Sequence, residues 1–274
     1  MKKTLRIMGL CALVTIAATS CQKNEEQFTN RITAELTQPN SDGKTYIGTG
    51  NYLMWNSGDQ IKVYDAAGAS HLFTTTNHDV VQTTFVSNDQ IDPNAAYCAF
   101  YPAANSSDLT GGYVYLTLNA NQTFANGSFA PNTYPIAAYN GGSGTAFTFH
   151  SPCGVLAIPL TGNCTIGSIE ITGNRGEALA GQLRVNPVGF DPLNPTNFTL
   201  VNPVTTITLT CPGGLTLTST PQTCVFVTRM GAFTQGFTAV VKGTDNSVIT
   251  TLTTTNNNMI LPEFIRLMPV VNIQ

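Results

Sequence analysis

Short runs of β-branched and aromatic residues, each ended by Gly, Pro, Asn or Asp, are the feature that most constrains the fold of this chain. Clear examples are residues 61–64, 113–118, 155–160 and 166–172. Runs of roughly four to eight such residues bounded by turn formers are typical of strands. No window shows the apolar stripe of an amphipathic helix. The sequence therefore predicts an all-β protein with many short strands and tight turns.

The predicted strands fall into two groups, separated by the Asn-Gly-Gly-Ser-Gly segment at residues 140–144. The strands expected before this segment are 32–36, 52–55, 61–64, 71–76, 80–86, 95–101 and 113–118. The strands expected after it are 155–160, 166–172, 183–185, 205–210, 215–218, 225–228, 237–242, 247–254 and 264–273. We therefore expect two successive β-sandwiches, residues 31–145 and 146–274, each large enough to have its own core.

The start of the chain has the pattern of an export signal. Basic residues precede an apolar run at residues 7–18, which is followed by small residues and then by Cys21. The run is too short for the ~20 residues that a spanning helix needs. A cysteine in this position predicts a lipoprotein signal at residues 1–20, with Cys21 acylated and anchored to a membrane. The alternative is an ordinary cleaved signal followed by an incidental cysteine.

Charge and composition describe an exported protein that does not bind nucleic acid. Residues 22–30 are polar and without periodicity, so residues 21–30 are expected to form a flexible tether. Charged residues make up 10% of the chain, against a usual ~25%. Removing the signal leaves 9 basic against 15 acidic residues. The sequence contains no cluster of basic residues of the kind that binds nucleic-acid phosphates, so nucleic-acid binding is not expected.

Five cysteines remain once Cys11 leaves with the signal and Cys21 is acylated. They are Cys98, Cys153, Cys164, Cys211 and Cys224. The number is odd, so at least one is unpaired. An exported location permits disulfides, either between the two that flank a probable hairpin (211 and 224) or between 153 and 164. The alternative is that all five are small apolar residues of the core.

We find no catalytic, cofactor-binding or metal-binding constellation and therefore expect a protein that is not an enzyme. Residues 142–144 lack the spacing of a nucleophile elbow, and residues 48–50 lack the spacing of a dinucleotide-binding loop. The three histidines, His71, His78 and His150, are isolated in the sequence. His71 and His78 could meet across a hairpin, but a partly exposed polar role is favoured over a metal site.

Several segments of the chain form an ordered series of motifs. They are W-N-S-G-D-Q-I-K-V-Y at 55–64, Y-C-A-F-Y-P at 97–102, C-G-V-L-A-I-P-L-T-G at 153–162, G-S-I-E-I-T-G at 167–173, L-A-G at 179–181 and G-F-T at 236–238. In this order they resemble the fimbrillin-like (Mfa-like) lipoproteins, subunits of the type V pili of Bacteroidetes. Each segment also has a structural interpretation. Trp55 is expected in the core, and residues 56–59 are expected to form a tight turn.

The resemblance implies two tandem transthyretin-like β-sandwiches and assembly by strand exchange. Such subunits are carried to the outer membrane as lipoproteins, and Glu25 and Glu26 resemble the acidic signal that sends some of them to the cell surface. A trypsin-like protease removes the first strand, and a neighbour's strand fills the exposed groove. The physical basis is that unpaired backbone groups and an open apolar groove are both costly.

Applied to this chain, the resemblance suggests candidate residues for processing and donation. The first strand is expected at 32–36, and Lys44 follows it where many relatives have Arg before Thr. Arg31 precedes the expected strand, so cleavage there would leave the strand in place. Both residues are candidate processing sites, and both could equally be exposed basic side chains. The candidate donor is the run 264–273, which could instead be an ordinary last strand.

The sequence therefore predicts an outer-membrane, surface-exposed lipoprotein of a fimbrium, acting as a pilus subunit or fimbrillin-like adhesin. Its partners would be copies of itself or sibling subunits, with ligands on host or microbial surfaces in addition. An uncleaved subunit would serve as a base or tip. The alternative is a carbohydrate-binding surface lipoprotein, which would stack sugars on Tyr113, Tyr115, Tyr134 or Tyr139. A third interpretation, a hydrolase, is disfavoured, because it would require a cleft with converging acid and base groups.

Overall fold

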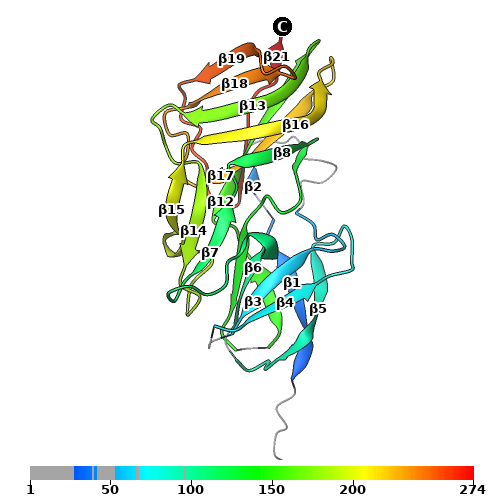
Figure 1. Cartoon of the computed structure of the whole chain (residues 1–274), viewed down its shortest axis with the longest axis vertical. Helices are drawn as coiled ribbons and strands as arrows, with labels where there is room; N and C mark the ends of the chain where they lie inside the picture. Colours follow the sequence, from blue (N-terminus) through cyan, green and yellow to red (C-terminus); the bar gives the residue numbers. More distant parts are fainter. Residues whose placement is uncertain (1–27, 39, 42–52, 66–67, 96, 143) are drawn as a thin grey trace, which may run out of the picture.

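The computed structural model describes residues 28–38, 40–41, 53–65, 68–95, 97–142 and 144–274. These residues form twenty-one strands and two short 3₁₀ helices, η1 (Ala103–Asn105) and η2 (Pro195–Asn197). No helix in the described part of the chain has the length and apolar character needed to cross a bilayer. The prediction of an all-β fold is therefore confirmed. Figure 1 shows an elongated molecule with one sheet at its lower end and three sheets above it.

The seven-stranded sheet, here called the lower sheet, curls until its two edges meet. In spatial order its strands are β10 (Ile136–Asn140), β6 (Tyr97–Tyr101), β3 (Gln60–Tyr64), β4 (Ser70–Thr74), β5 (Gln82–Ile91), β1 (Thr29–Leu36) and β11 (Ala146–Phe149). Ala137 of β10 and His150, just after β11, exchange two backbone hydrogen bonds of 2.8 Å. The sheet is thus nearly closed, which removes free edges.

The other three sheets form the upper part of the molecule. One sheet contains β17 (Gln222–Arg229), β12 (Cys153–Gly162), β20 (Phe264–Leu267) and β2 (Asn40–Ser41), with β21 (Val271–Ile273) also on β12. Another contains β19 (Val248–Thr254), β18 (Phe237–Gly243), β13 (Thr165–Gly173), β16 (Thr206–Thr216), β8 (Asn121–Ala125) and β9 (Ser128–Phe129). The last contains β15 (Thr199–Val204), β14 (Ala180–Val185) and β7 (Val114–Leu118).

The chain crosses between the two parts several times. β1 belongs to the lower sheet and β2 to an upper sheet, while β7, β8 and β9 pair above before β10 and β11 return below. Residues 146–149 therefore pair below, although they follow the boundary predicted at residue 145. One continuous cluster of buried side chains runs through both parts. The strand pairing thus crosses residue 145 in both directions, and a division into two domains at that point stays a prediction.

Several predicted strands have different bounds in the structure. In the run predicted at 52–55, residues 53–55 are described and only Trp55 pairs, as an isolated bridge to Val80. The runs predicted at 205–210 and 215–218 form one strand, β16.

The run 264–273 forms two strands. The Met268 N–H still donates to the Ala157 carbonyl of β12 at 2.8 Å, but Pro269 has no N–H to donate, and pairing with β12 resumes at Val271. The strand predicted at 80–86 is β5, which continues through the polar residues 87–90 to Ile91. These polar residues carry no apolar alternation that would have predicted a strand.

Trp55 lies at the centre of an aromatic cluster in the lower part, as predicted. Its side chain is 1% exposed and packs edge to face on Phe85, Tyr101 and Phe149, with ring centroids 5.0–5.4 Å apart. The predicted turn follows directly. Asp59 accepts a hydrogen bond from the Asn56 backbone N–H at 2.8 Å. The turn fixes the direction of the backbone directly after Trp55. The turn and the packing of the indole therefore stabilise one another.

We expect Trp55→Ala to destabilise the protein by about 3–5 kcal/mol, because it removes a buried aromatic side chain and three ring contacts. The measurement is the urea unfolding midpoint followed by circular dichroism. Val248→Ala, at a position 60% exposed, is the control and should change stability by less than about 0.5 kcal/mol. A loss below about 1 kcal/mol for Trp55→Ala would contradict the central packing role.

Candidate functional site

β1 is the strand on which the predicted assembly depends, and the structure places it inside the lower sheet. It pairs antiparallel with β5 and parallel with β11. Ile32, Ala34 and Leu36 point inward and are at most 5% exposed. Burying the two larger side chains is worth about 3–6 kcal/mol. β1 therefore completes both the hydrogen bonding and the core of the sheet, although it is the first strand of the described chain.

Arg31 lies within β1, as its third residue. The sequence had predicted that Arg31 precedes the strand, and this placement was wrong because the ladder extends to Thr29. Arg31 is exposed and stands opposite Val86 of β5. Cleavage at Arg31 would leave residues 32–36 paired on both sides. Cys21 and Lys44 lie outside the described residues, so their expected roles stay predictions.

The candidate donor run lies along β12. β20 pairs with residues 155–157 and β21 pairs with residues 160–162. On its other side, β20 is paired only by the two residues of β2 among the described residues. A Cβ atom on Gly162 would lie 2.3 Å from the Ile273 carbonyl oxygen, so β21 docks closely because this residue is glycine. Among the described residues, the outer side of β20 is thus paired only by the short segment that follows β1.

A polar cluster around Glu263 joins the end of β1 to the start of β20. Glu263 Oε1 accepts hydrogen bonds from Thr37 Oγ1 at 2.5 Å and from the Ser151 N–H at 3.1 Å. The same oxygen lies 3.0 Å from His150 Nδ1. Thr37 follows β1, and Ser151 follows β11. The Glu263 carboxylate thus connects its own segment to two others. Thr37 lies 226 residues away in the chain, and Ser151 lies 112 residues away.

The hydrogen bonds of this cluster set the charge state of Glu263. Burial alone would raise the pKa of this carboxyl group, but the hydrogen bonds from His150, Thr37 and Ser151 favour the carboxylate. The net effect holds the pKa of Glu263 below its ordinary value of 4.5. The folded-state pKa is therefore the lower one, so the cluster stabilises the fold above about pH 4.5 and loses this contribution as pH falls.

A cavity of about 500 Å³, here called the junction pocket, opens where the lower sheet meets β20. Its apolar floor is made by Leu36 at the end of β1, by Trp55 and Ile136, and by Ile265 of β20. These four side chains are at most 5% exposed. The pocket therefore lies beside both β1 and the candidate donor run. Its volume falls in the range of roughly 300–1,000 Å³ that is usual for small-ligand sites.

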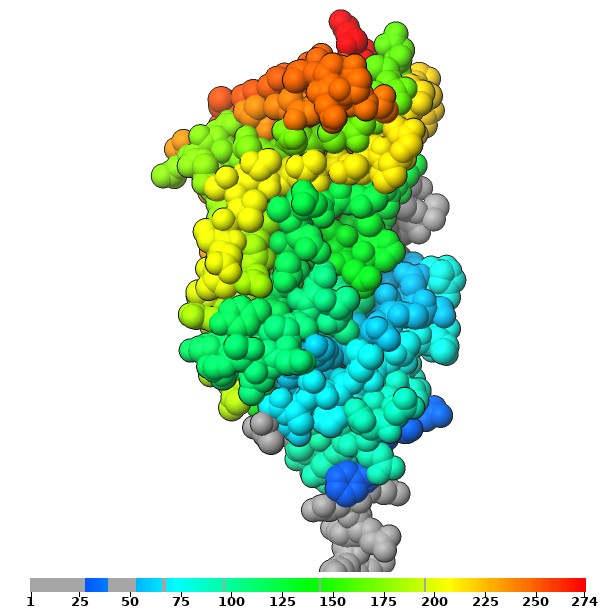
Figure 2. Space-filling view, viewed as in Figure 1, coloured from blue at the N-terminus to red at the C-terminus, as the bar shows by residue number. Residues whose placement is uncertain are grey.

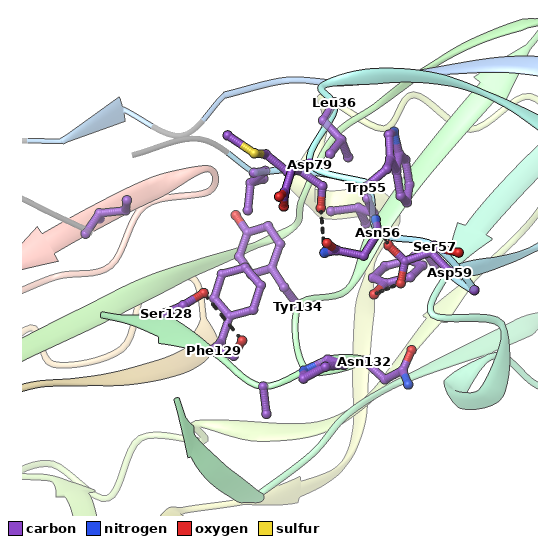
Figure 3. Close-up of a pocket in the computed structure, with 18 residues that line it drawn as sticks. Leu36, Trp55, Asn56, Ser57, Asp59, Asp79, Ser128, Phe129, Asn132 and Tyr134 are labelled. Carbon is purple, nitrogen blue, oxygen red and sulfur yellow. Dashed lines mark hydrogen bonds between the residues drawn. The ribbon is translucent and has the colours of Figure 1, made fainter. Parts of the chain in front are cut away.

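The side walls of the junction pocket differ in chemistry. Figure 3 shows the rings of Phe129 and Tyr134 on one side, stacked with centroids 5.0 Å apart and an angle of 15° between the ring planes. Asn56 and Asp59 of the tight turn form the opposite wall, and Asn132 lies on the rim. One wall thus offers an apolar ring, while the other offers hydrogen-bonding groups.

Two hydrogen bonds to Asp59, one of them partly buried, hold the polar wall in place. Tyr101 donates its hydroxyl to Asp59 Oδ1 at 3.0 Å, and the Asn56 N–H donates to Asp59 Oδ2. Burial and the neighbouring carboxylate raise the pKa of Tyr101, so its phenol stays protonated as a donor. The Trp55 Nε1 atom is buried and has no hydrogen-bond partner among the described residues. The sequence missed this pocket, apart from naming Tyr134 as an aromatic candidate.

The remaining candidate residues do not form a reactive centre in the described part of the chain. All five described cysteines are free thiols, and four of them are buried. Burial raises the pKa of Cys153 to about 12 and that of Cys211 to about 11, so these thiols are protonated near neutral pH. His71 lies 3.4 Å from Asp89, and His78 lies 3.0 Å from Asp79. No cluster of three potential metal ligands occurs among the described residues.

Comparisons with known proteins identify the fold. Neither a protein-family model nor a curated protein sequence matches the chain. Among solved structures, the chain is similar to a "putative cell adhesion protein" from Bacteroides uniformis, with a TM-score of 0.50 and 12% identity over 89% of this chain and 95% of that one. A second protein with this description, from Bacteroides ovatus, matches with a TM-score of 0.47 and 11% identity over 85% of this chain and 88% of that one.

A fimbrial protein is also among the structures found. The tip fimbrial protein Mfa3 from Porphyromonas gingivalis, truncated at its C-terminus, matches with a TM-score of 0.32 and 10% identity over 81% of each chain. At such identities the likeness concerns the fold alone, and the match to the Bacteroides uniformis protein is the one that supports it. The chain therefore shares the fold of this "putative cell adhesion protein", and the likeness agrees with the predicted resemblance to fimbrillin-like proteins.

We expect Glu263→Gln to lower stability at pH 7 by about 1 kcal/mol, because a neutral amide is a weaker acceptor than the carboxylate. The difference from the unchanged protein should shrink below about pH 4.5, where Glu263 itself becomes protonated. Urea midpoints between pH 7 and pH 3 measure both effects.

The matched control for this measurement is Glu35→Gln, at an exposed glutamate of β1. It should leave the acid limb of the stability curve unchanged. A Glu263→Gln protein that is equally stable at pH 7, or that keeps a constant deficit down to pH 3, would show that the cluster contributes no charge-dependent stability.

Proposed function

We propose that this chain is a surface-anchored fimbrial subunit or fimbrillin-like adhesin that assembles by exchange of β1 and has no enzymatic role. The observation that carries the proposal is the position of β1, which completes the lower sheet between β5 and β11 yet comes first in the described chain. The fold shared with the "putative cell adhesion protein" of Bacteroides uniformis supports the adhesive role. Such a protein would work at the cell surface and bind other subunits.

A single cut after Lys44 would release both strands that precede it. β1 would leave a groove between β5 and β11, and β2 would leave the outer side of β20 unpaired. The lost burial of Ile32 and Leu36 alone costs about 3–6 kcal/mol, and the exposed backbone groups add to this. The cut subunit would therefore bind a replacement strand strongly.

The C-terminal run has the residue pattern that this groove requires. Positions 265, 267, 269, 271 and 273 are all apolar, with the sequence Ile, Leu, Pro, Val and Ile. β1 likewise places apolar residues at alternate positions, and an incoming strand with the same direction would restore both ladders except at Pro269, which has no N–H to donate. We therefore propose residues 264–273 of a neighbouring subunit as the donor.

Cleavage would also separate the body from its anchor, because Cys21 precedes Lys44. A cut subunit would be held only by its neighbours, whereas an uncut subunit would keep both the lipid and its own β1. Processing at Lys44 would thus distinguish a polymerising subunit from a membrane-bound base or another accessory subunit.

The alternative function, that of a carbohydrate-binding lipoprotein, requires exposed tyrosines that can stack on sugars. Tyr113 carries the Arg184 guanidinium over its ring at 4.7 Å, and Tyr139 packs edge to face on Phe190. Tyr134 is only 3% exposed. The contacts of Tyr134 and Tyr139 favour a structural role, whereas Tyr113 is 37% exposed. Strand exchange remains the first proposal.

We expect Lys44→Gln to abolish ladders on non-boiled gels when the chain is exposed to a trypsin-like protease, because β1 stays in its groove. Arg31→Gln is the matched control and should ladder normally, since cleavage there leaves residues 32–36 paired. N-terminal analysis of the laddering form should give Thr45. Laddering that persists in Lys44→Gln, or a start at Ile32, would contradict this route.

We expect Cys21→Ser to abolish incorporation of a labelled fatty acid and to release the protein from membranes, because the thiol is the proposed attachment atom. The measurement is metabolic labelling followed by membrane fractionation. Cys164→Ser, which alters a half-buried cysteine of the folded body, is the control. Equal labelling of the Cys21→Ser protein and the unchanged protein would contradict lipidation at this residue.

A further inference from the structure

We propose that the junction pocket binds a neutral sugar ring, such as the terminal unit of a cell-surface glycan. The site is distinct from the groove proposed for strand exchange, and it is present while β1 is in place. The proposal thus goes beyond assembly and does not depend on it. It rests on the shape of the pocket, on its two chemically different walls and on its charge.

The aromatic wall suits the apolar face of a sugar ring. Phe129 is half-buried, lines the pocket and stacks on Tyr134, which restricts the movement of its ring. Sugars present C–H groups on one face of the ring, and aromatic side chains bind such faces by stacking. Trp55 does not take this role, because it is 1% exposed and contributes only to the floor.

The polar wall suits the hydroxyl groups at the edge of the same ring. A carboxylate has about four acceptor sites, and the Tyr101 hydroxyl and the Asn56 N–H use two of those on Asp59. The remaining sites can accept from sugar hydroxyls. The Asn56 side chain offers both donors and acceptors next to them, and it points into the pocket from the wall opposite Phe129 (Figure 3).

The negative charge of the pocket lining favours a ligand without negatively charged groups. The described residues that line the pocket include Asp59 and Asp79 and no Lys, Arg or His. An acidic sugar, a phosphate or a nucleotide would be repelled, because no cation among the described lining residues compensates for its charge. A neutral sugar satisfies both walls without this cost.

The turn that carries the polar wall is fixed before a ligand arrives. Asn56 and Asp59 are joined by a backbone hydrogen bond of 3.0 Å as well as by the carboxylate contact, and Gly58 adopts a φ of 90° between them. A pre-formed site loses less conformational freedom on binding than a mobile one does. The pocket therefore needs no rearrangement of this wall to receive a sugar.

The test is saturation-transfer NMR of the full mature chain with neutral mono- and disaccharides, with N-acetylneuraminic acid and a lysine-rich peptide as further probes. Emission from Trp55, the only tryptophan of the chain, gives an independent titration signal from the pocket floor. We expect at least one neutral sugar to bind and both further probes to fail.

Two variants locate the binding. Phe129→Leu keeps an apolar side chain but removes the flat ring, and Asn56→Ala removes the amide while keeping the backbone bond to Asp59. Each should weaken binding about two- to tenfold. Tyr113→Ala, at an aromatic residue outside the pocket, is the control and should bind as the unchanged protein does. Circular dichroism and the melting temperature verify that each variant folds.

The proposal is overturned if no neutral sugar binds, or if binding is unchanged in both pocket variants. It is also overturned if the lysine-rich peptide binds in a manner dependent on Phe129 while sugars do not, since the pocket would then be an amine site. If Phe129→Leu does not fold, Asn56→Ala and the Trp55 titration decide the question. Sugar binding in a Lys44→Gln protein that forms no ladder would separate this site from the assembly proposal.

Discussion

The backbone pairing of β1 with β5 on one side and β11 on the other is the interaction on which the lower sheet depends. β10 and β11 already meet through Ala137 and His150, so β1 fills the remaining gap in an almost closed sheet. In Figure 2, the blue surface of the first described residues appears at the lower end of the molecule, where this strand begins. Closure of the sheet by the first described strand leaves few free edges in the lower part.

Non-covalent contacts, as well as the chain itself, join the lower and upper parts of the molecule. The chain contributes strands alternately to the lower and upper sheets, and the Glu263 cluster joins the end of β1 to the turn before β20. The junction pocket lies at the same boundary, with Leu36 and Ile265 in its floor. A change in β1 would therefore reach the upper sheets through a polar contact and through shared apolar packing.

Local patterns in the sequence predicted part of this structure. The alternating apolar residues of 61–64 and 166–172 predicted strands, and the Trp55 turn was predicted as a core residue followed by a tight turn. The polar second half of β5 was not predicted, because nothing in its residue types favours a strand over a loop. Its pairing with Thr29 is decided by the sheet around it.

The candidate site was less accessible to sequence reasoning, because its parts come from distant segments. Glu263 meets Thr37 across 226 residues, and Phe129 comes from a two-residue strand that no alternation marks. The closing bridge between Ala137 and His150 is likewise a pairing of two edges, which local propensity does not encode. Tyr134 was named for its residue type, while its role as the backing of Phe129 follows only from the stacked geometry.

The direction of β1 has a mechanical consequence. Figure 1 shows β1 running along the length of the molecule from its lower end, while the C-terminus lies at the upper end. A pull between the two ends would load the hydrogen bonds on both sides of β1 in shear, since these bonds lie across the strand. Many would have to rupture together instead of peeling apart in sequence. The same strand that a cut after Lys44 is proposed to free would thus resist extraction by force.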